Sequence, residues 1–491
     1  MRQQELVRTN WTALCPSRYI LDSMPHLRFL IIATATAALL GAAEWPQFRG
    51  VNASGVSDAA NLPVEFGPAK NVIWKTALPD GHSSPVLTTN RIFVTAFDAD
   101  KLYVITLDRA NGKILWRREV PRPRKQELHK SNSPASPSVA TDGKNTYAFF
   151  TDFGLISHGP DGEERWRVPL GPFNNPFGLG ASPILANGKV IQVCDSETGS
   201  FLIAVDQKNG RVAWRVERPD MTRGFATPVL YRPGDGGLQV LVAGTNRLIA
   251  YEVETGKEIW SIRGLTWQMK PTPVVDGDIA YVLGWAGGAD QGNQEKIPPY
   301  AEVLKERDVN KDGKLGIDEV DPRYKKDLEE SDFNHDGFYD EREWEKFREK
   351  RSSINSVMAV RLGGSGDMTD KSILWRYYKS LPNVPSPLLY RNVLYLVKEG
   401  GILTALDAAT GAVLKQGRIP GAVDFYYSSP VAADGKIYTA SQSGQVAVIK
   451  AGPNWEMLSL NVMDDEVFAT PAPLDRYLYL RTRSALYCFG N

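Results

Sequence analysis

One short pattern recurs along this chain and limits its fold more than any other feature. A serine or threonine, then a proline, then an apolar strand-like run occurs eight times, at Ser84-Pro85, Ser136-Pro137, Ser182-Pro183, Thr227-Pro228, Thr272-Pro273, Ser386-Pro387, Ser429-Pro430 and Thr470-Pro471. Most neighbouring copies lie about 45 residues apart, and the gap from Pro273 to Pro387 is much longer. A period of this size, with several short strands in each unit, is typical of β-propeller blades. The sequence therefore predicts an all-β, eight-bladed propeller with four-stranded blades.

A second motif marks the outer half of each unit. An acidic residue, a glycine and a tryptophan are spaced four apart in three places, Asp108/Gly112/Trp116, Asp206/Gly210/Trp214 and Glu252/Gly256/Trp260, with a degenerate copy at Asp407/Gly411 and a shortened one at Asp161/Gly162/Trp166. The acidic residue and the glycine suit a tight turn, and the tryptophan can dock an outer strand against the next blade. The alternative, a tryptophan stripe that stacks ligands, is disfavoured at these positions.

The two ends of the repeat region predict how the ring closes. The last unit, from Thr470 to Phe489, ends before its own outermost strand. The strand-like residues 72–75 precede the first unit and can complete the last one. Such a closure leaves no open sheet edge.

These motifs resemble the pyrroloquinoline-quinone (PQQ)-type propeller repeat, whose consensus is A-x-D-x-x-T-G-x-x-x-W. Residues 251–260 and 405–411 come closest to it, and W-P-Q-F-R-G at 45–50 is similar to the opening of secreted bacterial members. The resemblance covers residues 45–491 apart from the long gap. It implies the fold and does not specify one activity, because a single architecture hosts many functions.

The long gap contains two complete calcium-loop patterns. The first, D-V-N-K-D-G-K-L-G-I-D-E, starts at Asp308, and the second, D-F-N-H-D-G-F-Y-D-E-R-E, starts at Asp332. EF-hand loops bind calcium through side chains at positions 1, 3, 5 and 12 and the carbonyl of position 7, with glycine at position 6. The sequence thus predicts two Ca²⁺ sites, one from Asp308, Asn310, Asp312, Glu319 and the Lys314 carbonyl, the other from Asp332, Asn334, Asp336, Glu343 and the Phe338 carbonyl. Leu315 and Tyr339 fall at position 8, where paired loops join through a short strand contact.

The loops define a small helical module inserted in the fifth blade. Residues 295–351 contain 18 acidic and 13 basic side chains, which predicts a solvated surface module whose negative charge favours calcium. The loops lie close together, so a large methionine-rich target groove of the calmodulin type is not expected. The alternative is an acidic helical hairpin without calcium. The resulting division is a propeller first part at 44–294, the EF-hand pair at 295–351 and a propeller second part at 352–491, closed by strand 72–75.

The N-terminal residues predict export. Met24 and basic Arg28 precede an apolar run from Phe29 to Leu40 and the small residues Gly41, Ala42 and Ala43. This run is too short for a transmembrane helix, which needs about 20 residues, and suits a cleaved signal peptide. We expect residues 1–43 to comprise a signal peptide with an N-terminal extension, the true start to be Met24, and the mature protein to be periplasmic or secreted. A short buried helix is the alternative.

Charge and cysteine content exclude several classes of function. Lysine plus arginine and aspartate plus glutamate number 57 each, so no basic surface suggests nucleic-acid binding. The five histidines show no zinc spacing. After removal of Cys15 with the signal peptide, Cys194 and Cys488 remain, and we expect buried thiols although export would permit a disulfide. We expect a monomer without a transmembrane segment.

The resemblance leaves two functions open. Quinone-dependent alcohol and sugar dehydrogenases of this superfamily use PQQ with calcium, and the alcohol dehydrogenases carry an adjacent Cys-Cys pair that this chain lacks. Their catalytic Asp and their calcium-binding Glu and Asn also match no motif here. Other relatives, such as the propeller lipoprotein of the outer-membrane barrel-assembly machinery, act as protein-binding scaffolds. We therefore favour a calcium-binding scaffold for an unknown protein or small-molecule ligand, with no catalytic residues, over a PQQ-dependent oxidoreductase.

Geometry indicates where a ligand would bind. The residues just before each innermost strand should meet at one mouth of the central channel, and this predicted set is His82, Asn132, Arg223, Phe225, Trp267, Lys270, Asp424, Tyr426, Tyr427, Glu466 and Phe468. Aromatic faces and charges of both signs suit a small-molecule or peptide site. The alternative is that these side chains only fill and cap the channel.

Overall fold

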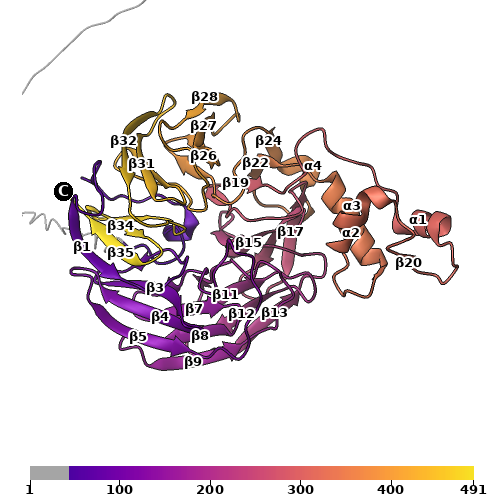
Figure 1. Ribbon diagram of the computed structural model, residues 1–491, viewed down its shortest axis with the longest axis horizontal. Helices are drawn as coiled ribbons and strands as arrows, with labels where there is room; N and C mark the ends of the chain where they lie inside the picture. Colours follow the sequence, from indigo (N-terminus) through magenta and orange to yellow (C-terminus); the bar gives the residue numbers. More distant parts are fainter. Residues whose placement is uncertain (1–43) are drawn as a thin grey trace, which may run out of the picture. The chain divides into compact units, whose positions relative to one another are not determined.

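The computed structural model describes residues 44–491, and eight sheets, each with four main strands, follow one another around a common centre (Figure 1). This arrangement confirms the predicted eight-bladed propeller. The predicted signal peptide, its N-terminal extension, Met24 and Cys15 lie outside the described residues.

In the first four sheets the strands follow chain order. They are β2 (Val86–Leu87), β3 (Arg91–Asp98), β4 (Lys101–Asp108) and β5 (Ile114–Val120); β6 (Ala140–Thr141), β7 (Thr146–Phe150), β8 (Gly154–His158) and β9 (Glu164–Pro169); β10 (Ile184–Ala186), β11 (Lys189–Cys194), β12 (Phe201–Asp206) and β13 (Val212–Glu217); and β14 (Val229–Tyr231), β15 (Gln239–Gly244), β16 (Arg247–Glu252) and β17 (Glu258–Arg263). The short β23 (Gly366–Asp367) adds a fifth, parallel strand beside β17.

The other four sheets include the blade that carries the insertion and the blade that closes the ring. They are β18 (Val274–Asp276), β19 (Ile279–Gly284), β22 (Ser356–Arg361) and β24 (Ile373–Tyr377); β25 (Leu388–Tyr390), β26 (Val393–Lys398), β27 (Ile402–Asp407) and β28 (Val413–Arg418); β29 (Val431–Ala433), β30 (Lys436–Ala440), β31 (Gln445–Lys450) and β32 (Glu456–Val462); and β33 (Ala472–Leu474), β34 (Tyr477–Arg481), β35 (Ala485–Phe489) and β1 (Val72–Ala77). The short helices are η1 (Val51–Ala53) and α4 (Thr369–Ser372).

The ring closes between strands from opposite ends of the described chain. Strand β1 pairs antiparallel with β35, with Trp74 opposite Cys488 and Ala77 opposite Ala485. The outermost strand of the eighth sheet therefore comes from residues that precede the first sheet.

Tryptophans join neighbouring sheets, as the turn motif predicts. The Trp116 indole of the first sheet donates to the Pro160 carbonyl of the second, and a Cβ built on Gly162 would lie 2.8 Å from that ring. Trp166 meets Gly210 of the next sheet in the same way. Both glycines have positive φ angles near 75°, so neither the backbone conformation nor the ring contact tolerates a side chain there.

The inserted segment leaves and rejoins the fifth sheet at one point. Gly284 at the end of β19 pairs with Ser356 at the start of β22, and the Asn355 amide both donates to and accepts from the backbone of Ala286. Between them lie α1 (Tyr300–Arg307), β20 (Leu315–Gly316), η2 (Pro322–Tyr324), α2 (Lys325–Glu329), β21 (Phe338–Tyr339) and α3 (Glu341–Ser352). These elements share an apolar cluster of their own, which includes Leu328, Trp344 and Phe347.

Two further features of the fold concern its cysteines and its helices. Cys194 and Cys488 are both unpaired and buried, which confirms that they pack as small apolar side chains. Among residues 44–491, no helix has the length and apolar character that a membrane crossing requires.

Candidate functional site

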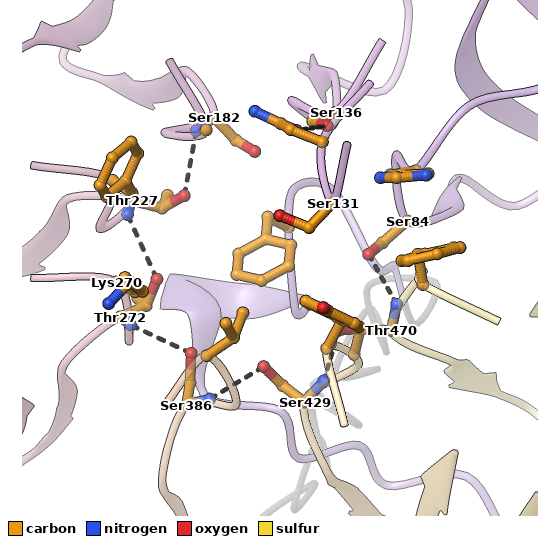
Figure 2. Close-up of a pocket in the computed structure, with 18 of the residues that line it drawn as sticks. Ser84, Ser131, Ser136, Ser182, Thr227, Lys270, Thr272, Ser386, Ser429 and Thr470 are labelled. Atoms are coloured by element: carbon orange, nitrogen blue, oxygen red, sulfur yellow. Dashed lines mark hydrogen bonds between the residues drawn. The ribbon is translucent and has the colours of Figure 1, made fainter. Parts of the chain in front are cut away.

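A closed ring of hydroxyl groups surrounds the centre of the propeller. In each blade, a serine or threonine just before the innermost strand accepts a hydrogen bond from the backbone N–H of its counterpart in the preceding blade, at 2.9–3.2 Å. Its members, which we call the hydroxyl belt, are Ser84, Ser138, Ser182, Thr227, Thr272, Ser386, Ser429 and Thr470. Figure 2 shows most of these contacts as dashed lines around the central space.

The second blade corrects one assignment of the repeat. Ser138, rather than the predicted Ser136, occupies the belt position: its N–H donates to Ser182 Oγ and its Oγ accepts from the Ser84 N–H. Ser136 instead donates to the Ser133 carbonyl and to Asn132, within the loop that precedes the strand. The position requires a hydroxyl and a free N–H, whereas the proline after it is dispensable, since valine follows Ser138.

The segment before the first blade crosses the channel. Trp45 bridges to Leu87 of the first blade, the Asn52 side chain donates to the Leu230 carbonyl of the fourth, and Val56 bridges to Ala432 of the seventh. The buried Arg49 guanidinium donates to the carbonyls of Pro387 and Pro430, and burial lowers its pKa to about 9. We call residues 45–57 the plug, because they tie together blades from several sides of the ring.

A cavity of about 450 Å³ occupies the channel above the plug. All eight belt residues line it, and Phe48 of the plug contributes one wall. Six members of the predicted mouth also line it: His82, Asn132, Phe225, Lys270, Tyr427 and Phe468. His82 stacks on Phe468 with ring centroids 3.9 Å apart. The structure thus brings about half of the predicted set together around one space.

The other five predicted residues lie outside this cavity. Tyr426 is buried and donates to the Ala422 carbonyl, while Asp424 accepts from the N–H groups of Phe425 and Ser443. Glu466 pairs with Arg483. These three residues brace loops between blades. Arg223 and Trp267 instead line a small cavity beside the inserted segment.

Lysine 270 is the only Lys, Arg, Asp or Glu side chain among the described residues that line the cavity. Its Nζ donates to the Trp285 carbonyl at 3.2 Å and lies 5.4 Å from the centre of the Trp285 ring. Burial lowers its pKa to about 7, an effect that nearby Glu399 opposes and Arg223 reinforces. Burial also lowers the pKa of His82 to about 4, so that imidazole is neutral at neutral pH.

Several lining residues were not predicted from the sequence. Phe48 arrives from the plug, His129, Ser131 and Phe177 come from long loops of the second and third blades, and Gln268, Trp285, Asn383 and Val384 complete the wall. The belt residues could be detected from the sequence, because they are the serines and threonines of the repeat itself. The loop residues carry no repeat and gave no such signal.

The two calcium-loop patterns adopt matching conformations. In the first, Asp308 accepts from the N–H groups of Asp312 and Gly313, and in the second Asp332 accepts from those of Asp336 and Gly337. Glycines 313 and 337 have φ angles of 77° and 80°. The predicted strand contact is confirmed, since Leu315 pairs with Tyr339.

The loop carboxylates bond to loop amides. Glu319 accepts from Val309 and Gly316, and Glu343 accepts from Phe333 and Asp340. Within residues 44–491, no three His, Cys, Asp or Glu side chains are grouped so that they could hold a metal by themselves. Each predicted set also needs an asparagine oxygen and a carbonyl, and Asn310 and Asn334 both turn their oxygens to the residue-5 amides of their loops.

Within residues 44–491, only the second of the two loops forms hydrogen bonds with the propeller. Asn174, between β9 and β10, donates to the Phe333 carbonyl at 2.9 Å. Arg342 donates to the carbonyls of Glu197 and Pro219 at 2.7 and 3.1 Å. Arg223 pairs with buried Glu197 and donates to the Glu330 carbonyl just before the loop.

Comparison with family models agrees with the repeat architecture. The model described as outer membrane protein assembly factor BamB, built of PQQ-type repeats, matches residues 67–198, 198–295 and 357–490. The chain belongs to this family. The unmatched stretch between the last two segments holds the inserted helices. No curated protein sequence matches the chain.

Solved structures support the same fold. BamB from Moraxella catarrhalis is 14% identical, with a TM-score of 0.51 over 82% of this chain and 99% of that protein. Quinohemoprotein alcohol dehydrogenases from Pseudomonas putida HK5 and Comamonas testosteroni are 11% and 12% identical, with TM-scores of 0.56 and 0.53, and each match covers 91% of this chain and 80% of the enzyme. At such identities the likeness establishes the fold alone.

Proposed function

We propose that this protein is an exported propeller of the BamB family that acts as a binding scaffold, with the channel cavity as its ligand site. The observation that carries the proposal is the cavity itself, which combines aromatic walls with converging polar groups and a volume suited to a small molecule. Membership of a family described as an assembly factor supports a binding role, and protein partners at the same mouth are compatible with it. The N-terminal sequence pattern supports export.

The cavity does not match the quinone arrangement implied by the enzymes. Catalysis with PQQ and calcium in this superfamily uses an aspartate with a calcium-binding glutamate and asparagine, yet no carboxylate lines this cavity among the described residues. Cys194 and Cys488 are buried within different sheets and cannot form the adjacent pair. We therefore assign no redox step to this chain.

We further propose that the inserted module binds two calcium ions. Support comes from the oxygen-rich ligand sets, the matching amide networks of both loops and the strand that couples them. Burial raises the pKa of Glu343 because it disfavours the charged carboxylate. A bound calcium ion would act in the opposite direction and stabilise the charged form. Secreted proteins meet abundant calcium, and weak sites suffice there.

Native mass spectrometry and absorbance of the purified mature protein test the scaffold proposal. Mature protein with up to two calcium ions, and without a quinone even after PQQ and calcium are added, is the expected result. A bound quinone accompanied by dye-linked alcohol oxidation would overturn the scaffold role in favour of an oxidoreductase. Calcium content is read from the same spectra and is judged separately.

A further inference from the structure

The hydroxyl belt leaves eight hydrogen-bond donors without acceptors. Each belt oxygen accepts one backbone N–H, and among the described residues none of the eight hydroxyls donates to another protein group. The eight belt residues are only 2–3% exposed, and all of them line the cavity. A hydroxyl carries one donor and two acceptor sites, so each belt hydroxyl keeps its O–H donor and one acceptor site for a ligand.

The charge of the cavity points the same way. Lys270 supplies a positive charge, and no carboxylate lines the space within the described residues. Glu399 lies behind the wall, where it accepts the N–H of Asn383. A partly buried ammonium without a counter-ion is costly, and a ligand that carries negative charge would offset that cost.

Other ligand classes fit these groups less well. A cationic ligand would face Lys270 and would find no carboxylate. A sugar or other neutral polyol could pair with the belt, but it would leave the Lys270 ammonium without a counter-charge. An oxyanion offers several acceptors and no donor, and its hydrogen bonds to O–H and N–H⁺ groups are of the strong charge-assisted kind.

We propose that the channel cavity binds an organic oxyanion, a carboxylate or phosphate group on an apolar body, through the belt hydroxyls and the Lys270 ammonium. The aromatic rings of Phe225, Tyr427 and Phe468 receive the apolar body. This inference rests on the proposed ligand-binding role and specifies the chemistry of its ligand.

Matched aromatic probes on the full mature chain test the inference. Benzoate and phenyl phosphate should bind in calorimetry or ligand-observed NMR, and benzyl alcohol and benzylamine should bind at least tenfold more weakly. The ratio of the two anions distinguishes a carboxylate from a phosphate ligand. Equal or tighter binding of the neutral or cationic probe would overturn the inference but leave a ligand cavity in place. Binding of none of the four at millimolar concentration would reject both proposals.

Substitutions distinguish the contribution of Lys270 and the belt hydroxyls to ligand affinity from a general effect on the protein. Lys270→Met should weaken benzoate at least tenfold, while Lys270→Arg retains most of the affinity because it keeps the charge. Lys113→Met removes an exposed lysine of the first blade and should change nothing. Thr272→Val should weaken benzoate severalfold, and Thr272→Ser should restore it. If Thr272→Val does not fold, the comparison of Lys270→Met with Lys270→Arg still tests the inference. Unchanged benzoate affinity in Lys270→Met would contradict it.

The pH dependence gives an independent readout. With a pKa of about 7, Lys270 is mostly charged at pH 6 and mostly neutral at pH 8.5, so benzoate affinity should fall about tenfold or more as pH rises. Glu399 and Arg223 act on it in opposite directions, His82 stays neutral above about pH 4, and burial raises the pKa of Tyr427. An affinity that does not change with pH, or that rises with it, would contradict the role of Lys270.

Discussion

The two loops of the inserted module have the same motif and the same internal hydrogen bonds, but different surroundings. At position 2, Val309 of the first loop is 81% exposed, whereas Phe333 of the second is 6% exposed and holds Asn174 of the propeller through its carbonyl. Glu343 is buried in the first turn of the α3 helix, and Arg342 of the same turn anchors that helix to the propeller. The motif therefore defines which residues bind calcium, and the residues that pack around each loop determine how firmly those ligands are held in place.

The largest expected effect comes from the position-12 glutamates. Glu319→Gln with Glu343→Gln should abolish binding of both calcium ions in calorimetry, because each change removes a charged bidentate ligand. Each single variant should lose one ion, and the tighter site should be the one that Glu343→Gln removes. Circular dichroism of the propeller should stay the same. Global unfolding of the double variant would show that the module is not an independent insertion.

Calcium removal should affect the loops unequally. With a chelator present, backbone amides of the first loop should exchange hydrogen about tenfold faster than with calcium, since among the described residues no hydrogen bond ties this loop to the propeller. Amides of the second loop should change much less, because the propeller contacts persist. Hydrogen exchange followed by mass spectrometry resolves the two loops. Equal acceleration in both loops would show that the propeller contacts do not hold the second loop in place.

A smaller effect should follow loss of the arginine anchor. Arg342→Met removes two hydrogen bonds from a charged group, so calcium affinity of the second loop should drop roughly three- to tenfold. The first loop should keep its affinity. Arg323→Met is a matched control, because Arg323 is exposed and pairs with Asp321 within the module. A similar loss in both variants would point to general destabilisation of the module.

The smallest effect is expected at Asn174. Asn174→Ala removes one neutral hydrogen bond to Phe333, which contributes about 0.5 kcal/mol to second-loop stability, so the affinity should fall about twofold. Asn187→Ala removes an exposed asparagine hydrogen bond to Glu254, outside the inserted module, and should leave both sites unchanged. Calorimetry with the first site inactivated by Glu319→Gln isolates the second. An unchanged second-site affinity would mean that Arg342 alone couples the loop to the propeller.

The periodic parts of this molecule were predictable, and the aperiodic parts were not. Eight blades, the closing strand, the tryptophan contacts and the Leu315–Tyr339 pair all follow from spacing, since each position repeats under the same geometric demand. The misassigned Ser136 shows the limit of that reasoning. Proline follows most belt residues, but the belt position does not require it.

The site depended on contacts that no repeat encodes. Asp424 and Glu466 precede innermost strands like the true lining residues, yet each finds hydrogen-bond partners in a neighbouring loop. Phe48 reaches the cavity only because the plug crosses the ring. The docking of Phe333 likewise depends on the length of loops in other blades, which a single sequence does not reveal.

The pairing of β1 with β35 has a consequence for how the protein forms. In every other blade the four main strands are neighbours in the chain or, in the fifth, are separated by one compact insert, so these blades can assemble in succession. The eighth must wait for strands from opposite ends of the described chain, and contacts of such long range are slow to form. Ring closure is therefore expected to be the last and slowest folding step, during which β35 exposes an unpaired edge that a chaperone would need to shield.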